Sequence, residues 1–212
     1  MKLCLKLLPV LAALLYVLAA GAGTYEDALR AVEIDDTRTV AELLRRGLDP
    51  DTVTPKGESI LMLAARKGNA DMVKTVLSAR PKVNARNAQG ETALMLAAIN
   101  GHLNVVRLLL ERGAEVNQPG WTPLMYAAAM DRMDVARLLL ERGAQVNATA
   151  QNGTSALMMA AREGHLQMVL LLLEHGADVN YTSAYGYNAL SIARDRGQRE
   201  VANVLMRAGA RQ

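Results

Sequence analysis

Residues 109–117 read LLERGAEVN, and residues 139–147 read LLERGAQVN. A second phrase accompanies these, as TALMLAA at 92–98 and TPLMYAA at 122–128. Successive copies are 33 residues apart except for one interval of 30, as the helix-ending positions show: 47, 80, 113, 143, 176 and 209. A period of this length is typical of stacked supersecondary units, none of which can bury its apolar face alone. The expected function therefore uses an extended surface rather than an enclosed pocket.

Each unit carries the signals of two helices. The first helix follows a residue that can accept hydrogen bonds from free backbone amides, and it contains two alanines that allow close packing, as at 127–128. The second helix has apolar residues at helical spacing, as at 105–110, and ends at a glycine suited to a left-handed C-terminal cap. The expected caps of the first helices are Ser59, Thr92, Thr122, Ser155 and Asn188.

Two units depart from this pattern. Arg80-Pro81 stands where other units have Gly-Ala, so we expect the helix before it to end without its usual cap, stopped by the residue that precedes proline. Between Asn117 and Gly120 the turn has lost three residues relative to its neighbours. The projecting turn there, which we call a finger, should be short and leave a notch near the centre of the row.

The segments TPLMYAA at 122–128, Gly101-His102 and GADVN at 176–180 resemble the ankyrin repeat, and the resemblance covers residues 24–212. It implies an all-α ankyrin-repeat solenoid, with helix-turn-helix units of about 33 residues joined by short turns or β-hairpins. Methionine replaces the usual histidine of the motif, and this variant resembles the motif of bacterial members of the family. The expected units are an N-terminal capping repeat at 23–53, repeats at 54–86 and 87–117, a repeat with the shortened finger at 118–149, a repeat at 150–182 and a C-terminal capping repeat at 183–212.

The first 22 residues have a different composition. Two lysines precede an apolar run at 7–20, and the small residues AGA follow at 20–22. This pattern predicts a secretory signal peptide over residues 1–22, cleaved near Ala22, and hence a periplasmic or secreted protein. The alternative is an uncleaved membrane anchor, but the run is shorter than the roughly 20 residues a bilayer needs and contains Pro9. After cleavage we expect no stable membrane insertion.

Charge and composition exclude several classes of function. Without Lys2 and Lys6, the 24 basic residues fall to 22 against 21 acidic ones, a net charge of +1. A nucleic-acid binder would have a dense basic face, so no nucleic-acid partner is expected. The single cysteine, Cys4, lies in the predicted signal, and the repeat keeps the three histidines apart. No glycine-rich phosphate-binding loop follows a strand. We expect a monomer with no enzyme activity, metal or cofactor.

Eleven methionines are many for this length, and four of them recur at one position of the repeat: Met62, Met95, Met125 and Met158. We call these four the methionine ladder. Thioether side chains fill irregular gaps in a core, and this is the interpretation we favour. The alternative is that exported methionines consume oxidants or hold Cu(I), which would protect the cell against oxidative stress.

The resemblance implies a protein partner at the finger tips and along the outward side of the first helices. Trp121, the only tryptophan, stands beside the shortened finger; we expect Ile99 and Met130 close to it, with Tyr185 and Tyr187 extending the stripe. Aromatic residues with arginine nearby are typical of interface hot spots, although Trp121 has the alternative role of filling the space left by the deletion. The predicted partner-binding residues are Arg66, Lys67, Glu91, Ile99, Trp121, Met130, Arg162, Tyr185 and Tyr187.

These features predict a non-catalytic protein-recognition module of the cell envelope, which supports or restrains one partner through its finger tips and concave face. One version, resembling certain exported bacterial ankyrin proteins, supports oxidative-stress defence. Another is an inhibitor or immunity protein against an envelope-acting enzyme. An inhibitor predicts tight binding that abolishes an activity, a scaffold predicts co-purification without inhibition, and an oxidant scavenger predicts activity without a partner.

Overall fold

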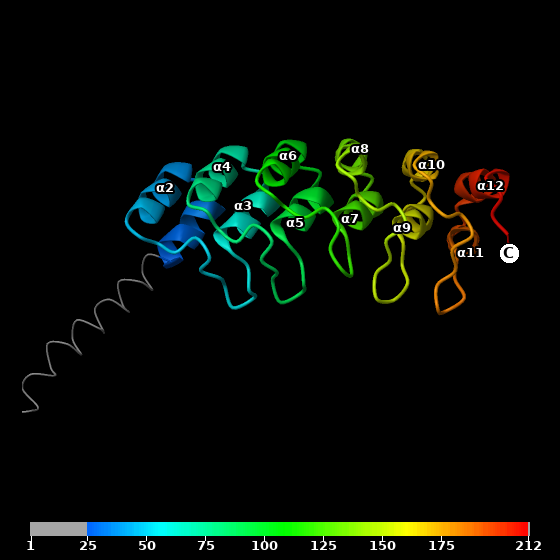
Figure 1. The fold of residues 1–212 in the computed structure, drawn as a ribbon, viewed down its shortest axis with the longest axis horizontal. Coiled ribbons are helices and arrows are strands. Elements are labelled where there is room, and N and C mark those ends of the chain that lie inside the picture. The colour runs from blue at the N-terminus through cyan, green and yellow to red at the C-terminus, as the bar shows by residue number, and fades with distance from the viewer. Residues whose placement is uncertain (1–24, 212) are drawn as a thin grey trace, which may run out of the picture.

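The computed structural model describes residues 25–211, which form a row of helix pairs with fingers along one edge (Figure 1). Residues 25–33 are helical and precede α2 (Thr37–Arg45). In the later pairs, the first helix lies nearer the fingers and the second lies away from them. The first helices are α3 (Ile60–Lys67), α5 (Ala93–Asn100), α7 (Pro123–Ala129), α9 (Ala156–Glu163) and α11 (Ala189–Asp195). The second helices are α4 (Ala70–Ser78), α6 (Leu103–Glu111), α8 (Met133–Glu141), α10 (Leu166–Glu174) and α12 (Arg199–Arg207).

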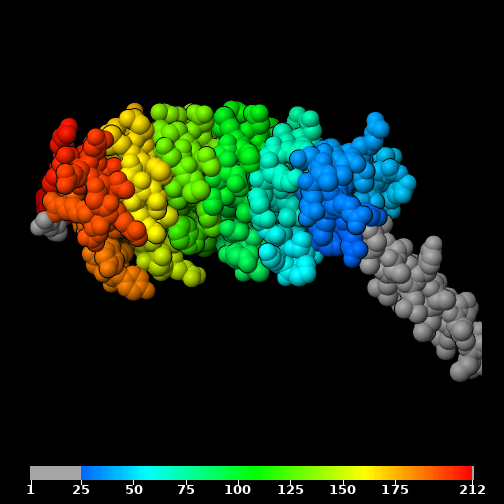
Figure 2. Space-filling model, turned by 180° about the vertical axis from the view of Figure 1, so that it is seen from behind, coloured from blue at the N-terminus to red at the C-terminus, as the bar shows by residue number. Residues whose placement is uncertain are grey.

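Each helix packs onto its neighbours in the row. First helices contact first helices from α3 through α11, and second helices contact second helices from α2 through α12. Successive segments of the chain therefore form successive bands across the molecule (Figure 2). Apart from the helices, regular structure between residues 25 and 211 is limited to two isolated antiparallel bridges, Val53 with Ser59 and Thr149 with Ser155. The prediction of an all-α solenoid is confirmed.

No helix in the described range, residues 25–211, has the length and apolar character needed to cross a membrane. The predicted signal peptide, residues 1–22, lies outside this range.

The alanine pairs of the first helices lie in the core. The pairs at 64–65, 97–98, 127–128 and 160–161 are fully buried, because each first helix is covered by the first helix of the next unit. In the last unit Arg194 stands where the others have the second alanine, and it is exposed. A polar outer face of this kind is what a terminal repeat needs for solubility.

The predicted N-caps are confirmed at all five first helices. Each cap side chain accepts a hydrogen bond from the backbone N–H three residues later, as Thr92 does from Met95 at 3.3 Å. Asn188 and Ser191 bond each other's backbone reciprocally, which makes a capping box. The caps are Ser59, Thr92, Thr122, Ser155 and Asn188.

The second helices end with a left-handed residue, and here one expectation is wrong. Gly113 has a φ of 84° and donates to the Leu110 carbonyl at 3.2 Å. Arg80 was not expected to provide this cap, yet it has a φ of 57° and makes the equivalent bond, to the Leu77 carbonyl, at 3.1 Å. The unit lacks only the hydrogen bond that the backbone N–H of the next residue makes in other units, because that residue here is Pro81, which has no N–H to donate.

One side chain per unit ties each turn to the next unit. Asn117 donates from Nδ2 to the Gly143 carbonyl and accepts at Oδ1 from the Gln145 N–H, both at 2.8 Å. In the first unit Asp51 instead accepts from the Lys82 N–H at 2.7 Å, and its other oxygen lies 3.8 Å from the Lys82 ammonium. We call these contacts the turn clamps. The two-bond clamp recurs at Asn84, Asn147 and Asn180.

Candidate functional site

Full-length fingers share one closed turn. In the finger at 54–58, the Thr54 N–H donates to the Glu58 carbonyl at 2.9 Å, and the Gly57 N–H donates back to the Thr54 carbonyl at 2.8 Å. Gly57 has a φ of 75°, a conformation that glycine adopts without strain. The same pair of bonds closes the fingers at 87–91, 150–154 and 183–187. In residues 25–211, only the finger at 117–121 lacks both bonds.

The full-length fingers pack together in two pairs. A Cβ on Gly57 would lie only 3.1 Å from the backbone nitrogen of Ala88, whose N–H donates to the Lys56 carbonyl at 3.0 Å. A Cβ on Gly153 would likewise lie 3.0 Å from the Ser183 Cβ. The first two full fingers are therefore in contact, as are the last two.

The short finger separates these two pairs. A Cβ on Gly120 would meet nothing within 4 Å, and in Figure 1 the loop before α7 reaches less far than its neighbours. A hollow of about 350 Å³ lies here, lined by Gln89 of the preceding unit, by Gln151 of the next unit and by Trp121. We call it the central notch, and it lies where the shortened turn predicted it.

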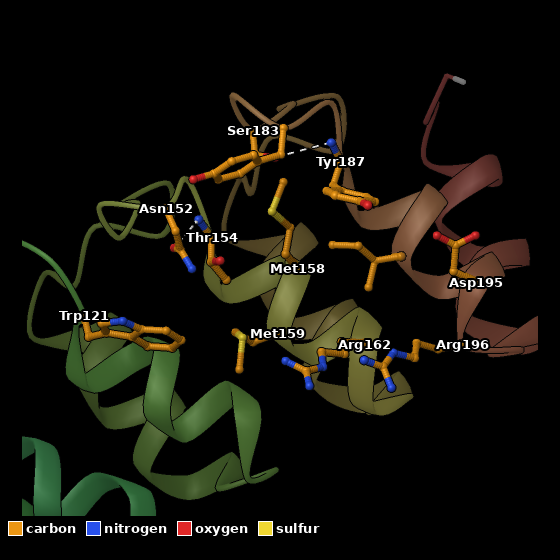
Figure 3. A pocket seen from close by; sticks show the side chains of 12 residues that line it. Trp121, Asn152, Thr154, Met158, Met159, Arg162, Ser183, Tyr187, Asp195 and Arg196 are labelled. Atoms are coloured by element: carbon orange, nitrogen blue, oxygen red, sulfur yellow. Dashed lines mark hydrogen bonds between the residues drawn. The ribbon is translucent and has the colours of Figure 1, made fainter.

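A larger hollow of about 580 Å³ lies beside the notch, along α9, α11 and the last two fingers (Figure 3). We call it the aromatic hollow. Trp121 borders both hollows. The exposed fractions are 37% for Trp121, 52% for Tyr187 and 73% for Tyr185. The other side chains that line the aromatic hollow include Met159, Arg162, Ile192, Asp195 and Arg196. The structure thus brings together four predicted contact residues: Trp121, Arg162, Tyr185 and Tyr187.

Trp121 is held from within the protein through Tyr126. The two ring centroids are 5.7 Å apart with the planes tilted by 39°. The Tyr126 hydroxyl donates to Glu91 Oε1 at 3.2 Å, and Glu91 Oε2 accepts from Asn87 Nδ2 at 2.9 Å. Burial, together with the Glu91 carboxylate, raises the pKa of Tyr126 to about 12, so the hydroxyl keeps its proton at ordinary pH. Glu91, predicted as a contact residue, therefore bonds inside the protein and positions the aromatic pair.

Arg66 and Lys67 lie apart from the aromatic hollow. They line a different hollow of about 490 Å³ near the start of the row. Arg66 forms an ion pair with Glu58, and the Lys67 ammonium lies 3.5 Å from an Asp35 carboxylate oxygen. Lys67 also donates to the Glu33 carbonyl. Both cations therefore have partners inside the chain, and Lys67 joins the first unit to the second.

Ile99 and Met130 do not lie beside Trp121, so that expectation is wrong. Trp121 precedes the N-cap of α7, whereas Met130 is its C-cap. The helix between them is about 10 Å long at the usual rise per residue. The Ile99 carbonyl accepts from Arg132 Nε at 3.0 Å at the start of α8. Neither Ile99 nor Met130 lines the notch or the aromatic hollow.

The methionines and histidines that could suggest metal or redox chemistry have structural partners. The methionine ladder is at most 3% exposed, as expected of core residues. His102 donates from Nε2 to the Arg66 carbonyl at 2.9 Å, and His165 makes the same contact with Ala129 at 3.1 Å. These two histidines thus tie their units to the preceding ones, whereas His175 bonds the Leu171 carbonyl of its own helix at 2.9 Å. Residues 25–211 contain no group of three or more His, Cys, Asp or Glu side chains that could hold a metal ion.

Among the residues that line the two hollows but were not predicted as contact residues are Tyr126, Met159 and Ile192. Each is the fourth residue after the N-cap of its first helix, and each lines the notch or the aromatic hollow. The signal was present in the sequence, because the cap fixes the helix register and residues at this position share one face. The sequence did not show at which of these units the neighbouring fingers leave the helix face exposed.

Comparison with protein families gives matches over most of the chain. The family described as ankyrin repeats (3 copies) matches residues 28–119 and 80–150, and that described as ankyrin repeats (many copies) matches residues 139–193. A search of curated proteins returned no significant match.

Proposed function

The chain belongs to the ankyrin repeat family, and from this premise we propose that it recognises one partner protein through its fingers and the exposed side of its first helices. Ankyrin repeats are protein–protein interaction modules and are generally non-catalytic. The observation that supports this proposal most directly is the aromatic hollow. Partly exposed Trp and Tyr side chains next to Arg are the residues that dominate the energetics of protein interfaces.

We place this recognition in the cell envelope because of the signal peptide predicted at residues 1–22. The mature chain would contain no cysteine, since Cys4 lies within that segment, and it would suit an oxidising compartment. There the protein supports or restrains a single envelope protein.

The scavenging alternative has less support. Met62, Met95, Met125 and Met158 are packed between repeats and at most 3% exposed, so oxidants have little access to them. Exposed thioethers remain at Met130 and Met206, at 46% and 42%, but they are separate surface residues and not the ladder on which the alternative depends.

Photocross-linking tests the recognition proposal. A photoreactive amino acid at position 121, activated in intact cells, should capture one protein that mass spectrometry identifies in the envelope fraction. Trp121→Ala should then weaken that complex by about 2 kcal/mol or more, roughly a thirtyfold rise in Kd. The matched control is Leu170→Ala, because Leu170 is also apolar and 42% exposed but lines neither hollow. Circular dichroism should show both variants folded.

Three outcomes would contradict parts of the proposal. Equal affinity of Trp121→Ala and the unchanged protein would remove the aromatic hollow from the interface. A cross-linked partner found only in the cytoplasm would contradict export. Catalytic turnover by the purified protein would contradict a recognition role. If the partner is an enzyme, its activity in the complex separates an inhibitor from a scaffold.

A further inference from the structure

The aromatic hollow holds half of the aromatic residues that the structure describes. Among residues 25–211 these are Tyr25, Trp121, Tyr126, Tyr181, Tyr185 and Tyr187. Three of them line the hollow, and a fourth, Tyr126, packs against Trp121 with the ring centroids 5.7 Å apart. With Met159 and Ile192, they form an apolar wall that a partner side chain can cover.

The charges of the hollow favour an acidic ligand group. Arg162 lies near the end of α9 and Arg196 follows α11, so two neighbouring units present guanidinium groups to the same hollow (Figure 3). Asp195 is the one carboxylate that lines the hollow in the described part of the chain. The Nε of Arg162 lies 3.4 Å from a Glu163 oxygen, which leaves its terminal nitrogens for a ligand. Guanidinium forks bind carboxylates in a bidentate manner.

The span of the hollow indicates an extended chain. It runs from Trp121 in one unit to Arg196 two units later. Neighbouring packed helices are typically 8–10 Å apart, so two steps cover about 16–20 Å. An extended peptide rises about 3.3 Å per residue, and five or six residues would bridge that distance. Nucleic acid fits less well, because it would place several phosphates against a site with two arginines and an aspartate.

We propose that the aromatic hollow binds an extended acidic segment of the partner protein. An Asp or Glu of that segment bonds Arg162 and Arg196, and an apolar or aromatic residue several positions away packs on Trp121 and Met159. This inference rests on the proposed recognition function and adds the chemistry of the ligand. The exposed tyrosines, Tyr185 and Tyr187, cover the segment from the finger side.

A peptide selection tests the inference. Random displayed peptides of about ten residues are selected on the purified protein, and synthetic copies of the enriched sequences are titrated. The enriched peptides should contain an Asp or Glu and, several residues away, an aromatic or large aliphatic residue. Arg162→Ala or Arg196→Ala should each weaken binding about tenfold or more, and added salt should weaken binding to the unchanged protein.

Arg194→Ala is the matched control. Arg194 lies in the last turn of α11, two residues before Arg196, and is exposed, but it does not line the hollow, so its loss should leave the affinity unchanged. A second selection on the double variant Arg162→Glu/Arg196→Glu should replace the acidic residue of the enriched peptides with Lys or Arg. Circular dichroism checks that each variant is folded.

The outcomes separate this inference from the function on which it rests. Enriched peptides that need Trp121 but have no acidic residue, or whose affinity ignores both arginines, overturn the acidic preference and leave protein recognition standing. A single-stranded oligonucleotide that binds with the same dependence on Arg162 and Arg196 overturns the assignment to a peptide. If no peptide is enriched although the cross-linked partner still requires Trp121, the extended segment is wrong. If that partner is also absent, both proposals fall.

Discussion

At Arg80 the backbone has a φ of 57°, a left-handed conformation in which a side chain with a Cβ crowds the following carbonyl. The equivalent positions in later units are glycines, with φ values from 81° to 93° at Gly113, Gly143, Gly176 and Gly209. The sequence showed that the glycine was missing but not that the turn would keep its shape. The stack imposes that shape, because Pro81 must enter the buried position that Ala114 and Ala177 occupy in their units.

We expect Arg80→Gly to stabilise the protein by about 0.5–1 kcal/mol, because removing the Cβ strain exceeds the entropy that glycine adds to the unfolded chain. Urea unfolding followed by circular dichroism measures the change. Arg112→Gly is the control: Arg112 has a φ of −104°, so the same substitution there relieves no strain and should be neutral or destabilising. A loss of stability for Arg80→Gly would show that the arginine side chain contributes more than its backbone costs.

The turn clamps operate between elements. Asn117 needs both halves of its amide, because Nδ2 donates to Gly143 and Oδ1 accepts from Gln145. A carboxylate can make only the second bond and would place an oxygen against the Gly143 carbonyl. Asp51 is tolerated in the first unit because Lys82 supplies both the N–H and a nearby ammonium.

Asn117→Asp should therefore destabilise the protein by about 1–2 kcal/mol, as measured by chemical unfolding at neutral pH. The matched control is Asn152→Asp. Asn152 accepts through Oδ1 from the Thr154 N–H at 3.1 Å, a bond that a carboxylate can also accept, so the change should stay within about 0.5 kcal/mol. Equal losses in the two variants would mean that general surface charge, rather than the missing donor, causes the effect.

For the whole molecule, stability passes from unit to unit through shared faces. Ala161 is fully buried, whereas Arg194, at the same position of the last unit, is exposed. The difference arises because the next first helix, α11, packs on α9, whereas no further first helix follows α11 within residues 25–211. In a repeat stack, damage to one interface should detach what lies beyond it and leave the rest folded.

Ala161→Arg should accordingly weaken the last interface by about 3 kcal/mol or more, since it buries an unpaired charge. Hydrogen exchange should show lost protection in α11 and α12 while α3 to α7 remain protected. Arg194→Ala serves as the control and should change stability by no more than about 0.5 kcal/mol. Uniform loss of protection along the row would show that the units unfold as one block.

The sequence by itself determined the repeat period, the helix caps, the left-handed glycines and the shortened finger. These features depend on hydrogen bonds and steric limits between residues a few positions apart in the chain. They can therefore be recognised from the order of residues in the sequence. The sequence also predicted that Trp121, Arg162, Tyr185 and Tyr187 are contact residues, because their positions in the repeat place them on the outer face.

Only the tertiary structure decided which of the predicted contact residues meet. Tyr126 and Glu91 are 35 residues apart, and no local pattern joins them. Arg66 and Lys67 form ion pairs with carboxylates of the same chain. Ile99 and Met130 lie at the C-terminal ends of their first helices, away from Trp121. These outcomes depend on how one unit is placed against the next. That placement is set by side-chain packing across the whole interface, and short-range periodicity does not encode it.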